Sequence, residues 1–168
     1  MANGFVVNAH RFDPYKNFKF RVLWDGKVVM GVSKVSSLKR TTDVVKHRSG
    51  GENSHDHKSP GRTTYEGITL DRGLTHDPEF EKWANMVHTY EGDSMMALAG
   101  YKKDLMLEVL NEKDQVALRY KLYACWVSEY VAVPDLDANA NAVAIEHMKI
   151  ELEGWERDTG TAEPNEAG

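Results

Sequence analysis

Three histidines have the residue type and the spacing that could bind a metal ion. His55 and His57 flank Asp56 in a glycine-rich polar stretch, and His47 precedes that stretch at the end of an expected strand. A zinc site needs three or four ligands whose orientation is fixed by neighbouring hydrogen bonds, and a glycine-rich segment supplies such support poorly. A solvated polar loop is therefore the simpler interpretation. A metal-dependent hydrolase that uses His47, His55 and His57 remains an alternative hypothesis.

The other reactive side chains do not form a catalytic arrangement. Cys125 lies in a strand that reads as buried, where a thiol has neither the lowered pKa nor the access of a catalytic thiolate. The carboxylates are scattered, and no pair of them stands out as an acid and a base. The glycines at 50, 51 and 61 lack the spacing of a phosphate-binding loop. We therefore expect no enzyme activity, no cofactor and no metal.

Size and charge restrict the class of protein further. The chain has 168 residues and a formal net charge of −5, with a single cysteine. This length favours one domain whose core needs no disulfide, and one cysteine fits folding in a reducing compartment such as the cytoplasm. A mildly acidic balance argues against nucleic-acid binding, which needs concentrated positive charge. No apolar run approaches the ~20 residues of a membrane span, and no apolar secretion segment opens the chain.

Two hairpins are predicted from alternating apolar residues. Phe18, Phe20, Val22 and Trp24 recur at period two, and the alternation resumes at 28, 30 and 32 after Asp25-Gly26, a strong turn signal. A second hairpin joins 104–110 to 116–127. Its longer strand becomes apolar on both faces near Cys125, which indicates cover on both sides, by a helix or by another chain.

The region between the hairpins is more polar. Residues 39–47 are β-prone but polar on both faces, so we expect an edge strand or a strand along a wet surface. Residues 48–60 follow as glycine-rich polar sequence without periodicity, which predicts a long loop with a function. A further strand is predicted at 63–70, with an irregularity near Gly67.

Asp77 and Pro78 then start the one convincing helix, of about thirteen residues to Tyr90, with Phe80 and Trp83 on its apolar face. The last strand, 143–155, shifts its apolar parity as a β-bulge would. The fold class is thus mainly β (β+α): an antiparallel sandwich or barrel of about seven strands with one packed α-helix. We expect a single domain at 1–158, with an arm at 1–16 and a disordered tail at 159–168.

Long stretches of the chain resemble a known family. Residues 8–38 contain DPYKNFKFRV, residues 50–73 contain GGEN, PGRT and ITLDRG, and residues 121–158 contain CWVSEY, PDLDANANAVAIEH and EGWERD. Together these motifs resemble the tail-tube (inner tube) proteins of contractile bacteriophages and of phage-tail-like contractile injection systems. The resemblance implies a structural subunit, a homohexamer whose rings stack into a rigid hollow tube. It further implies that contraction of a surrounding sheath drives this tube, with cargo or DNA, through a target envelope.

The resemblance also implies partners and surfaces. The partners would be further copies of the chain, a contractile sheath protein, baseplate or spike proteins, tube-terminating caps and a possible lumen cargo, in a phage virion or an injection particle. Residues 48–61 would form an inter-subunit loop. The expected interface residues are Gly50, Gly51, Glu52, Asn53, Pro60, Gly61 and Arg62.

The two-sided polar strand suits a channel wall. We therefore expect Lys39, Thr41 and Asp43 to face the lumen, or Arg40 and Thr42 if the other parity faces inward. Besides the hydrolase, the remaining alternatives are a monomeric ligand-binding β-barrel and a tube-like terminator or baseplate protein.

Overall fold

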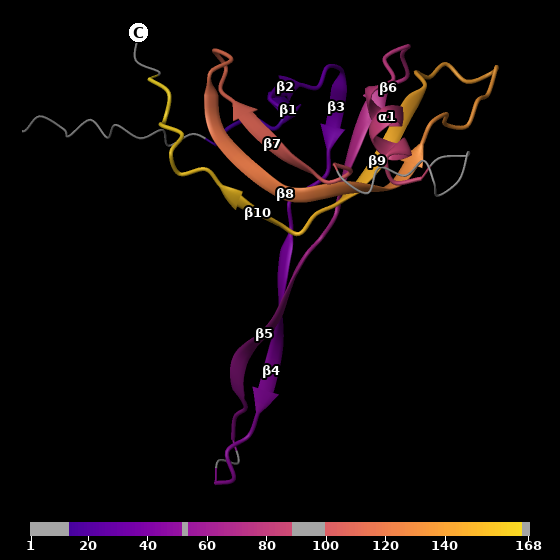
Figure 1. Cartoon of the computed structure of the whole chain (residues 1–168). Coiled ribbons are helices and arrows are strands. Elements are labelled where there is room, and N and C mark those ends of the chain that lie inside the picture. Colours follow the sequence, from indigo (N-terminus) through magenta and orange to yellow (C-terminus); the bar gives the residue numbers. More distant parts are fainter. Residues whose placement is uncertain (1–13, 52–53, 89–99, 166–168) are drawn as a thin grey trace, which may run out of the picture.

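Strands dominate the chain, and a long hairpin of two of them leaves the body that the others form (Figure 1). The computed structural model describes residues 14–51, 54–88 and 100–165. The elements, in chain order, are β1 (Phe20–Trp24), β2 (Lys27–Val28), β3 (Val32–Val35), β4 (Arg40–His47), β5 (His57–Tyr65), β6 (Ile68–Gly73), α1 (Glu79–Asn85), β7 (Lys103–Leu110), β8 (Val116–Val131), β9 (Ile145–Glu151) and β10 (Gly154–Arg157).

The body is one strongly curved antiparallel sheet in the order β2-β1-β7-β8-β9-β6-β3, with β10 paired to β8. The 16-residue strand β8 runs through both halves of the sheet, pairing with β7 along its first part and with β9 along its second. Strands β2 and β3 end this order and have free edges within the described part of the chain. The expected antiparallel β architecture with one helix is confirmed.

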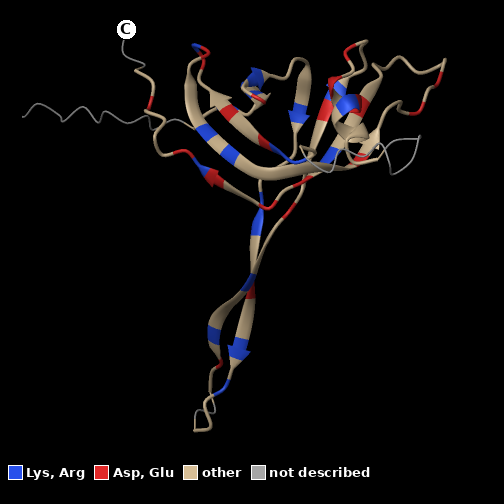
Figure 2. Cartoon of the chain, in the orientation of Figure 1, with Lys and Arg blue, Asp and Glu red and all other residues tan. Residues whose placement is uncertain are grey.

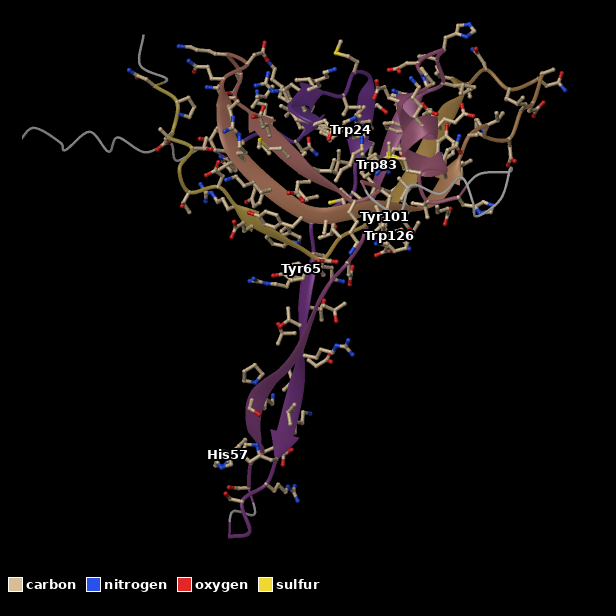
Figure 3. The ribbon with its side chains drawn as sticks, in the orientation of Figure 1. Trp24, His57, Tyr65, Trp83, Tyr101 and Trp126 are labelled. Carbon is tan, nitrogen blue, oxygen red and sulfur yellow. The ribbon has the colours of Figure 1, made fainter. Side chains whose placement is uncertain are left out.

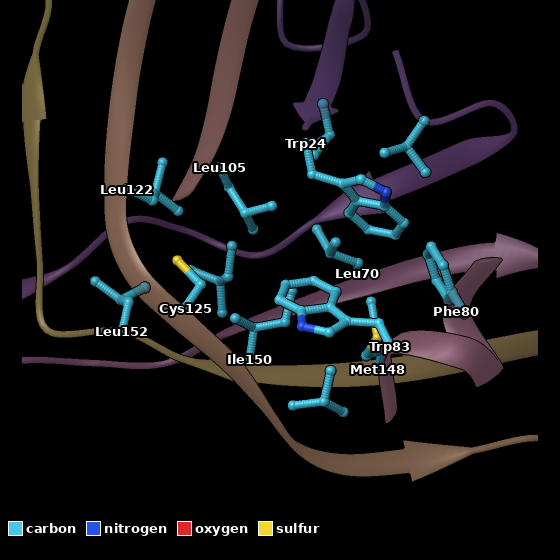
Figure 4. Packing of buried hydrophobic residues seen from close by; sticks show 14 residues of the cluster. Trp24, Leu70, Phe80, Trp83, Leu105, Leu122, Cys125, Met148, Ile150 and Leu152 are labelled. Atoms are coloured by element: carbon cyan, nitrogen blue, oxygen red, sulfur yellow. The ribbon is translucent and has the colours of Figure 1, made fainter. Parts of the chain in front are cut away.

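The core lies in the hollow of the curved sheet and is closed by α1. Trp24 packs edge-on against Trp83 with ring centroids 5.0 Å apart, and Phe80 and Trp83 of the helix are almost fully buried. Figure 4 shows these rings meeting Leu70, Met148 and Ile150 from the opposite strands. Side chains from both halves of the sheet therefore fill the interior, and their removal from water stabilises the body.

The first hairpin forms around Asp25-Gly26 as predicted. Both turn residues have positive φ, +50° and +73°, and the turn pairs Trp24 with Lys27. The expected alternation at 28, 30 and 32 is wrong, because β2 has only two residues and Gly31 turns the chain with φ +79°. Met30 is 73% exposed, whereas Val29 between the two expected core residues is buried.

The second hairpin, β7–β8, also forms as predicted, but the two-sided apolar run in β8 has another cause. Ala124 adopts φ +50°, and the pairing with β7 shifts register between Lys103 and Leu105. As a result Leu122 lies in the core on one side of this irregularity, and Cys125 and Val127 lie in it on the other. A bulge that switches faces, rather than cover on both faces, explains the pattern.

The helix is shorter than its apolar periodicity predicts. It spans Glu79–Asn85, with Pro78 at the capping position and the Asp77 carboxylate accepting the Glu79 N–H at 3.2 Å. The core role of Phe80 and Trp83 is confirmed, and Tyr90 lies outside the described residues. No helix in the described ranges is both long enough and apolar enough to cross a bilayer.

The hairpin β4–β5 corrects the predicted long loop. Residues 57–61, expected in that loop, are strand, so only 48–56 connect the two strands. The strand expected at 63–70 is broken at Glu66-Gly67 into β5 and β6. A Cβ on Gly67 would come within 2.8 Å of the Ile150 carbonyl oxygen, so only glycine fits at this junction.

The C-terminal strand is two strands rather than one bulged strand. Val143 is 81% exposed and precedes β9, in which Glu146, Met148 and Ile150 share the buried face. The chain then turns at 152–153 into β10. Gly160 and Thr161 hydrogen-bond back to Asp158, while 166–168 and residues 1–13 of the arm lie outside the described residues. The single domain at 1–158 and a disordered tail at 159–168 stay predictions.

Candidate subunit interface

The hairpin β4–β5 is a large surface that the body does not cover. All eight residues of β4 are exposed, and the two strands form a sheet of their own that shares no strand with the main sheet. Figure 1 shows it extending well beyond the body. An isolated two-stranded hairpin is at best marginally stable in water. A hairpin of this length is therefore a natural place for a contact with another molecule.

A β-bulge shapes the middle of the hairpin at the PGRT motif. Thr42 pairs with Thr63 and Val44 with Pro60, so Gly61 and Arg62 together oppose the single residue Asp43. A Cβ on Gly61 would lie 3.0 Å from the Val45 side chain and 3.2 Å from the Asp43 carbonyl oxygen. The motif thus places a glycine where a side chain would press on the neighbouring strand, and the bulge adds local twist.

Aromatic packing fixes the root of the hairpin on the body. Tyr65 meets Trp155 of β10 edge-on at 5.9 Å between ring centroids, and Tyr120 meets the same indole at 6.1 Å. The Arg40 guanidinium lies 5.7 Å from the Trp155 ring centroid, within the range of a cation–π contact. Figure 3 places Tyr65 where the hairpin joins the body and His57 near its far end.

The three histidines come together at the far end, although not as a metal site. The His47 and His57 rings stack with centroids 5.5 Å apart, and the His55 ring meets His57 edge-on at 5.2 Å. Arg48 and Asp56 close the connection with a 2.8 Å ion pair. Within the described ranges, no three His, Cys, Asp or Glu side chains are arranged to hold a metal ion.

The expected interface residues fall into two groups that lie apart on the hairpin. Gly50 and Gly51 are in the connection, where an added Cβ would meet nothing within 4 Å. Pro60, Gly61 and Arg62 are in β5, around the bulge, and all three are exposed. Glu52 and Asn53 lie outside the described residues.

The expected lumen residues are all exposed and lie toward the root of the hairpin. Lys39 forms a 3.2 Å ion pair with Glu66, Thr41 pairs with Thr64, and Asp43 faces the bulge. Thr42 belongs to the other parity of β4, and its hydroxyl group shares a hydrogen bond of 2.9 Å with the hydroxyl group of Thr63 on β5. Both parities of β4 are exposed in the part of the chain that the structure describes.

A buried ion network that was not predicted from the sequence lies where the start of α1 meets strands β6 and β9. Arg72 is 2% exposed and donates to Glu146 on the paired strand β9 at 2.7 Å. Its other nitrogens donate to the carboxylate and the carbonyl oxygen of Asp77, and its guanidinium lies 4.2 Å from the Phe80 ring centroid. Tyr130 donates to Glu146 at 2.9 Å. The arginine of ITLDRG therefore connects β6, β9 and the start of α1.

A second network crosses three strands on the other half of the sheet. Glu108 on β7 is nearly fully buried and accepts hydrogen bonds from Arg21 on β1 and from Arg119 on β8, the latter at 2.7 Å and 2.9 Å. Burial by itself would raise the pKa of Glu108, but the two guanidinium groups outweigh it, and the pKa lies below its ordinary value. This carboxylate is therefore ionised in the folded protein and fixes the strand register.

The structure gives Cys125 no reactive character. Its side chain is fully buried, and burial raises the pKa of the thiol to about 12. A neutral, inaccessible thiol is not a nucleophile at neutral pH. The role expected for Cys125, a small core residue, agrees with its place in the buried cluster.

The chain thus has the form of a curved β-sheet body that carries a projecting hairpin. It belongs to the family of the T4-like virus tail tube protein gp19, whose model matches residues 16–156. No protein with curated annotation matches the sequence significantly.

Solved structures with the same fold include chains of the anti-feeding prophage and of an extracellular contractile injection system. A chain of the anti-feeding prophage tube-terminating cap superposes with a TM-score of 0.73 at 21% identity, covering 92% of this chain and 99% of that one. A chain of the PVC sheath-tube complex, an extracellular contractile injection system, gives 0.71 at 20% identity, with coverages of 86% and 91%. A chain of the six-fold symmetrised anti-feeding prophage baseplate gives 0.70 at 20% identity, with coverages of 86% and 95%.

Proposed function

We propose that this chain is the repeating subunit of the inner tube of a contractile tail or injection system. Copies assemble into homohexameric rings, and the rings stack into a hollow, rigid tube inside a contractile sheath. On contraction the tube is driven through a target envelope and conveys cargo or DNA. Family membership supports the tube role, and the fold shared with chains of sheath-tube, baseplate and cap assemblies supports the contractile setting.

The observation that carries this proposal is the hairpin β4–β5. Eight consecutive β4 residues are exposed on a hairpin whose root packs on Trp155 and whose outer part extends away from the body (Figure 1). The free edges of β2 and β3 add unpaired backbone groups that a neighbouring copy can satisfy by strand addition. A closed ring uses such edges and ends growth in that direction.

The individual surfaces belong to the same proposal. The connection with Gly50, Gly51, Glu52 and Asn53, and the bulge with Pro60, Gly61 and Arg62, contact neighbouring subunits. Lys39, Thr41 and Asp43 are proposed for the lumen wall. They lie near the root of the hairpin, where it leaves the body, and they are open to solvent in the single chain.

The remaining partners follow from the same role. A sheath protein surrounds the tube. Baseplate or spike proteins bind at one end of the tube, and a cap protein terminates the other end. The subunit is made in the bacterial cytoplasm and becomes part of a virion or an injection particle.

The test is assembly with and without the hairpin. Replacing residues 43–62 by Asn-Gly joins Thr42 to Thr63 through a favoured two-residue turn and keeps the aromatic root. Wild-type protein should form rings or tubes in negative-stain electron micrographs and sediment in an ultracentrifuge. The shortened chain should keep its circular dichroism spectrum and remain unassembled. A wild-type chain that stays a 19.0 kDa monomer at every concentration would refute the proposal, as would normal tubes from the shortened chain.

A further inference from the structure

The outer half of the hairpin carries a charge arrangement that is unfavourable in the single chain. Strands β4 and β5 contain four basic residues and one acidic residue. Lys46 and Lys58 are direct cross-strand partners, so their ammonium groups emerge side by side on one face. Like charges in directly opposed positions destabilise a sheet pair. Neither lysine has an ion-pair partner within the described part of the chain.

The same face of the hairpin also carries exposed apolar surface. Val44 and Pro60 form the next pair on that face, two positions toward the root, and Val44 is 59% exposed. The face therefore presents a small apolar patch beside two unneutralised positive charges. Its complement is an apolar surface that carries carboxylates.

The connection between β8 and β9 has this complementary composition. Residues 132–144 read AVPDLDANANAVA, with two acidic residues and no basic one. Leu136 is 75% exposed between Asp135 and Asp137, and Val143 is 81% exposed. These residues line a shallow depression of about 290 Å³ together with Pro134, Ala140 and His147.

A turn shapes the loop that carries Asp135 and Asp137, but no basic side chain among the described residues pairs with their carboxylates. Asp137 accepts the N–H of Asn139 at 2.9 Å, and its carbonyl oxygen accepts the N–H of Ala140 at 3.1 Å, which shapes the loop as an Asx-type turn. Both Asp135 and Asp137 are exposed, and neither is in an ion pair within the described residues. Figure 2 shows acidic positions on this connection and basic positions along the hairpin, which points away from it. One chain therefore cannot bring the two surfaces together.

We infer that the Val44, Lys46, Lys58 and Pro60 face of one copy docks on the 134–144 connection of a second copy. Val44 and Pro60 cover the Leu136 and Val143 surface, and the two lysines neutralise Asp135 and Asp137. Because the two surfaces differ, the contact is head-to-tail, the kind that closes into rings or continues as a helical stack. This inference rests on the proposed tube function and identifies the surface that receives the hairpin.

Charge reversal tests the contact directly. The hairpin variant is Lys46→Glu with Lys58→Glu, and the connection variant is Asp135→Lys with Asp137→Lys. All four side chains are exposed, so both variants should keep the wild-type circular dichroism spectrum and melting temperature. Each variant alone should raise the protein concentration needed for tube formation by roughly ten-fold or more, because like charges then meet across the interface.

The decisive test restores attraction between the two surfaces by reversing the charges on both of them. The four-fold variant should form tubes again, and an equimolar mixture of the two double variants should co-assemble, because each hairpin then finds a connection of opposite charge. The inference is overturned if wild-type tubes form and either double variant forms them equally well, or if neither the four-fold variant nor the mixture recovers. It is also overturned if tubes are normal and only sheath binding is lost. A wild-type chain that forms no tubes refutes the proposed function as well.

Discussion

The buried guanidinium of Arg72 joins β6, β9 and the start of α1. Replacing Arg72 with methionine keeps much of the volume but leaves the Glu146 carboxylate buried without its partner. Breaking a buried pair in this way costs about 3–5 kcal/mol of unfolding free energy. Urea unfolding of the unassembled subunit measures the loss, and Lys34→Met on the exposed face of β3 is the matched control, with a change within about 0.5 kcal/mol.

The double variant Arg72→Met/Glu146→Gln shows whether the pair or the packing is responsible. Once the unpaired charge is gone, a large part of the stability should return, because the cost of the single change is mostly an uncompensated carboxylate. If the double variant is as unstable as the sum of the two single ones, the network contributes through packing on Phe80 instead.

Glu108 makes the unfolding free energy of the body depend on pH in the acidic range. Its pKa is lowered in the folded chain relative to the ordinary value of 4.5, so its contribution is complete above that value and is lost as the pH falls through the folded pKa. Unfolding free energy measured from pH 6 downward should therefore fall in the wild type below about pH 4.5. The Glu108→Gln variant should be less stable at neutral pH and should show a shallower acid dependence. Parallel curves for the two proteins would contradict this assignment.

The Arg72 network could be recognised in part from the residue pattern of the two strands. Arg72 has the same strand parity as Ile68 and Leu70, and Glu146 has that of Met148 and Ile150, so each charge lies in a row of buried positions. A charge in such a row requires a partner. The partner itself could not be predicted, because it depends on the pairing of β6 with β9 across more than seventy residues of sequence.

At the scale of elements, Trp155 controls how firmly the hairpin is held. Trp155→Ala removes the ring that Tyr65, Tyr120 and Arg40 contact, and it should leave the hairpin loosely attached to a folded body. We expect faster trypsin cleavage at Lys46, Arg48 and Lys58 and a clear loss of tube formation. Trp155→Phe is the control, because it keeps an aromatic ring in place and should retain most of both properties. Unchanged cleavage in the alanine variant would show that the root is fixed by backbone pairing alone.

Element prediction succeeded where local chemistry specifies the backbone. Asp25-Gly26 predicts a tight turn, and the alternation of apolar residues over 104–127 predicts the long hairpin. It failed where an ordinary residue adopts a rare conformation, since nothing marks Ala124 as a site of positive φ. It also failed across 57–61, where proline and glycine indicated a loop but belong to a bulged strand. The interface role of these residues could be expected only from the family motifs.

At the scale of the whole molecule, assembly should protect particular backbone segments. Hydrogen exchange followed by mass spectrometry compares the unassembled subunit with tubes. Amides of β3 and of β4 should exchange rapidly in the subunit, since β3 is an edge and β4 is exposed, and should slow by about ten-fold or more in tubes. Amides of β9, which is paired on both sides, are the internal control. Equal exchange of β3 and β4 in both states would exclude these strands from the contacts.

The separation of the hairpin from the main sheet has an evolutionary consequence. Residues 40–65 are joined to the body at the junctions near Lys39 and Gly67, and among the strands that the structure describes, none of the main sheet pairs with β4 or β5. Substitutions and length changes between Thr41 and Thr64, beyond the root contacts of Arg40 and Tyr65 with Trp155, can therefore accumulate without disturbing the buried cluster. If the hairpin makes the proposed contacts between subunits, selection can change how subunits pack by altering this hairpin alone, without changing the body that carries it.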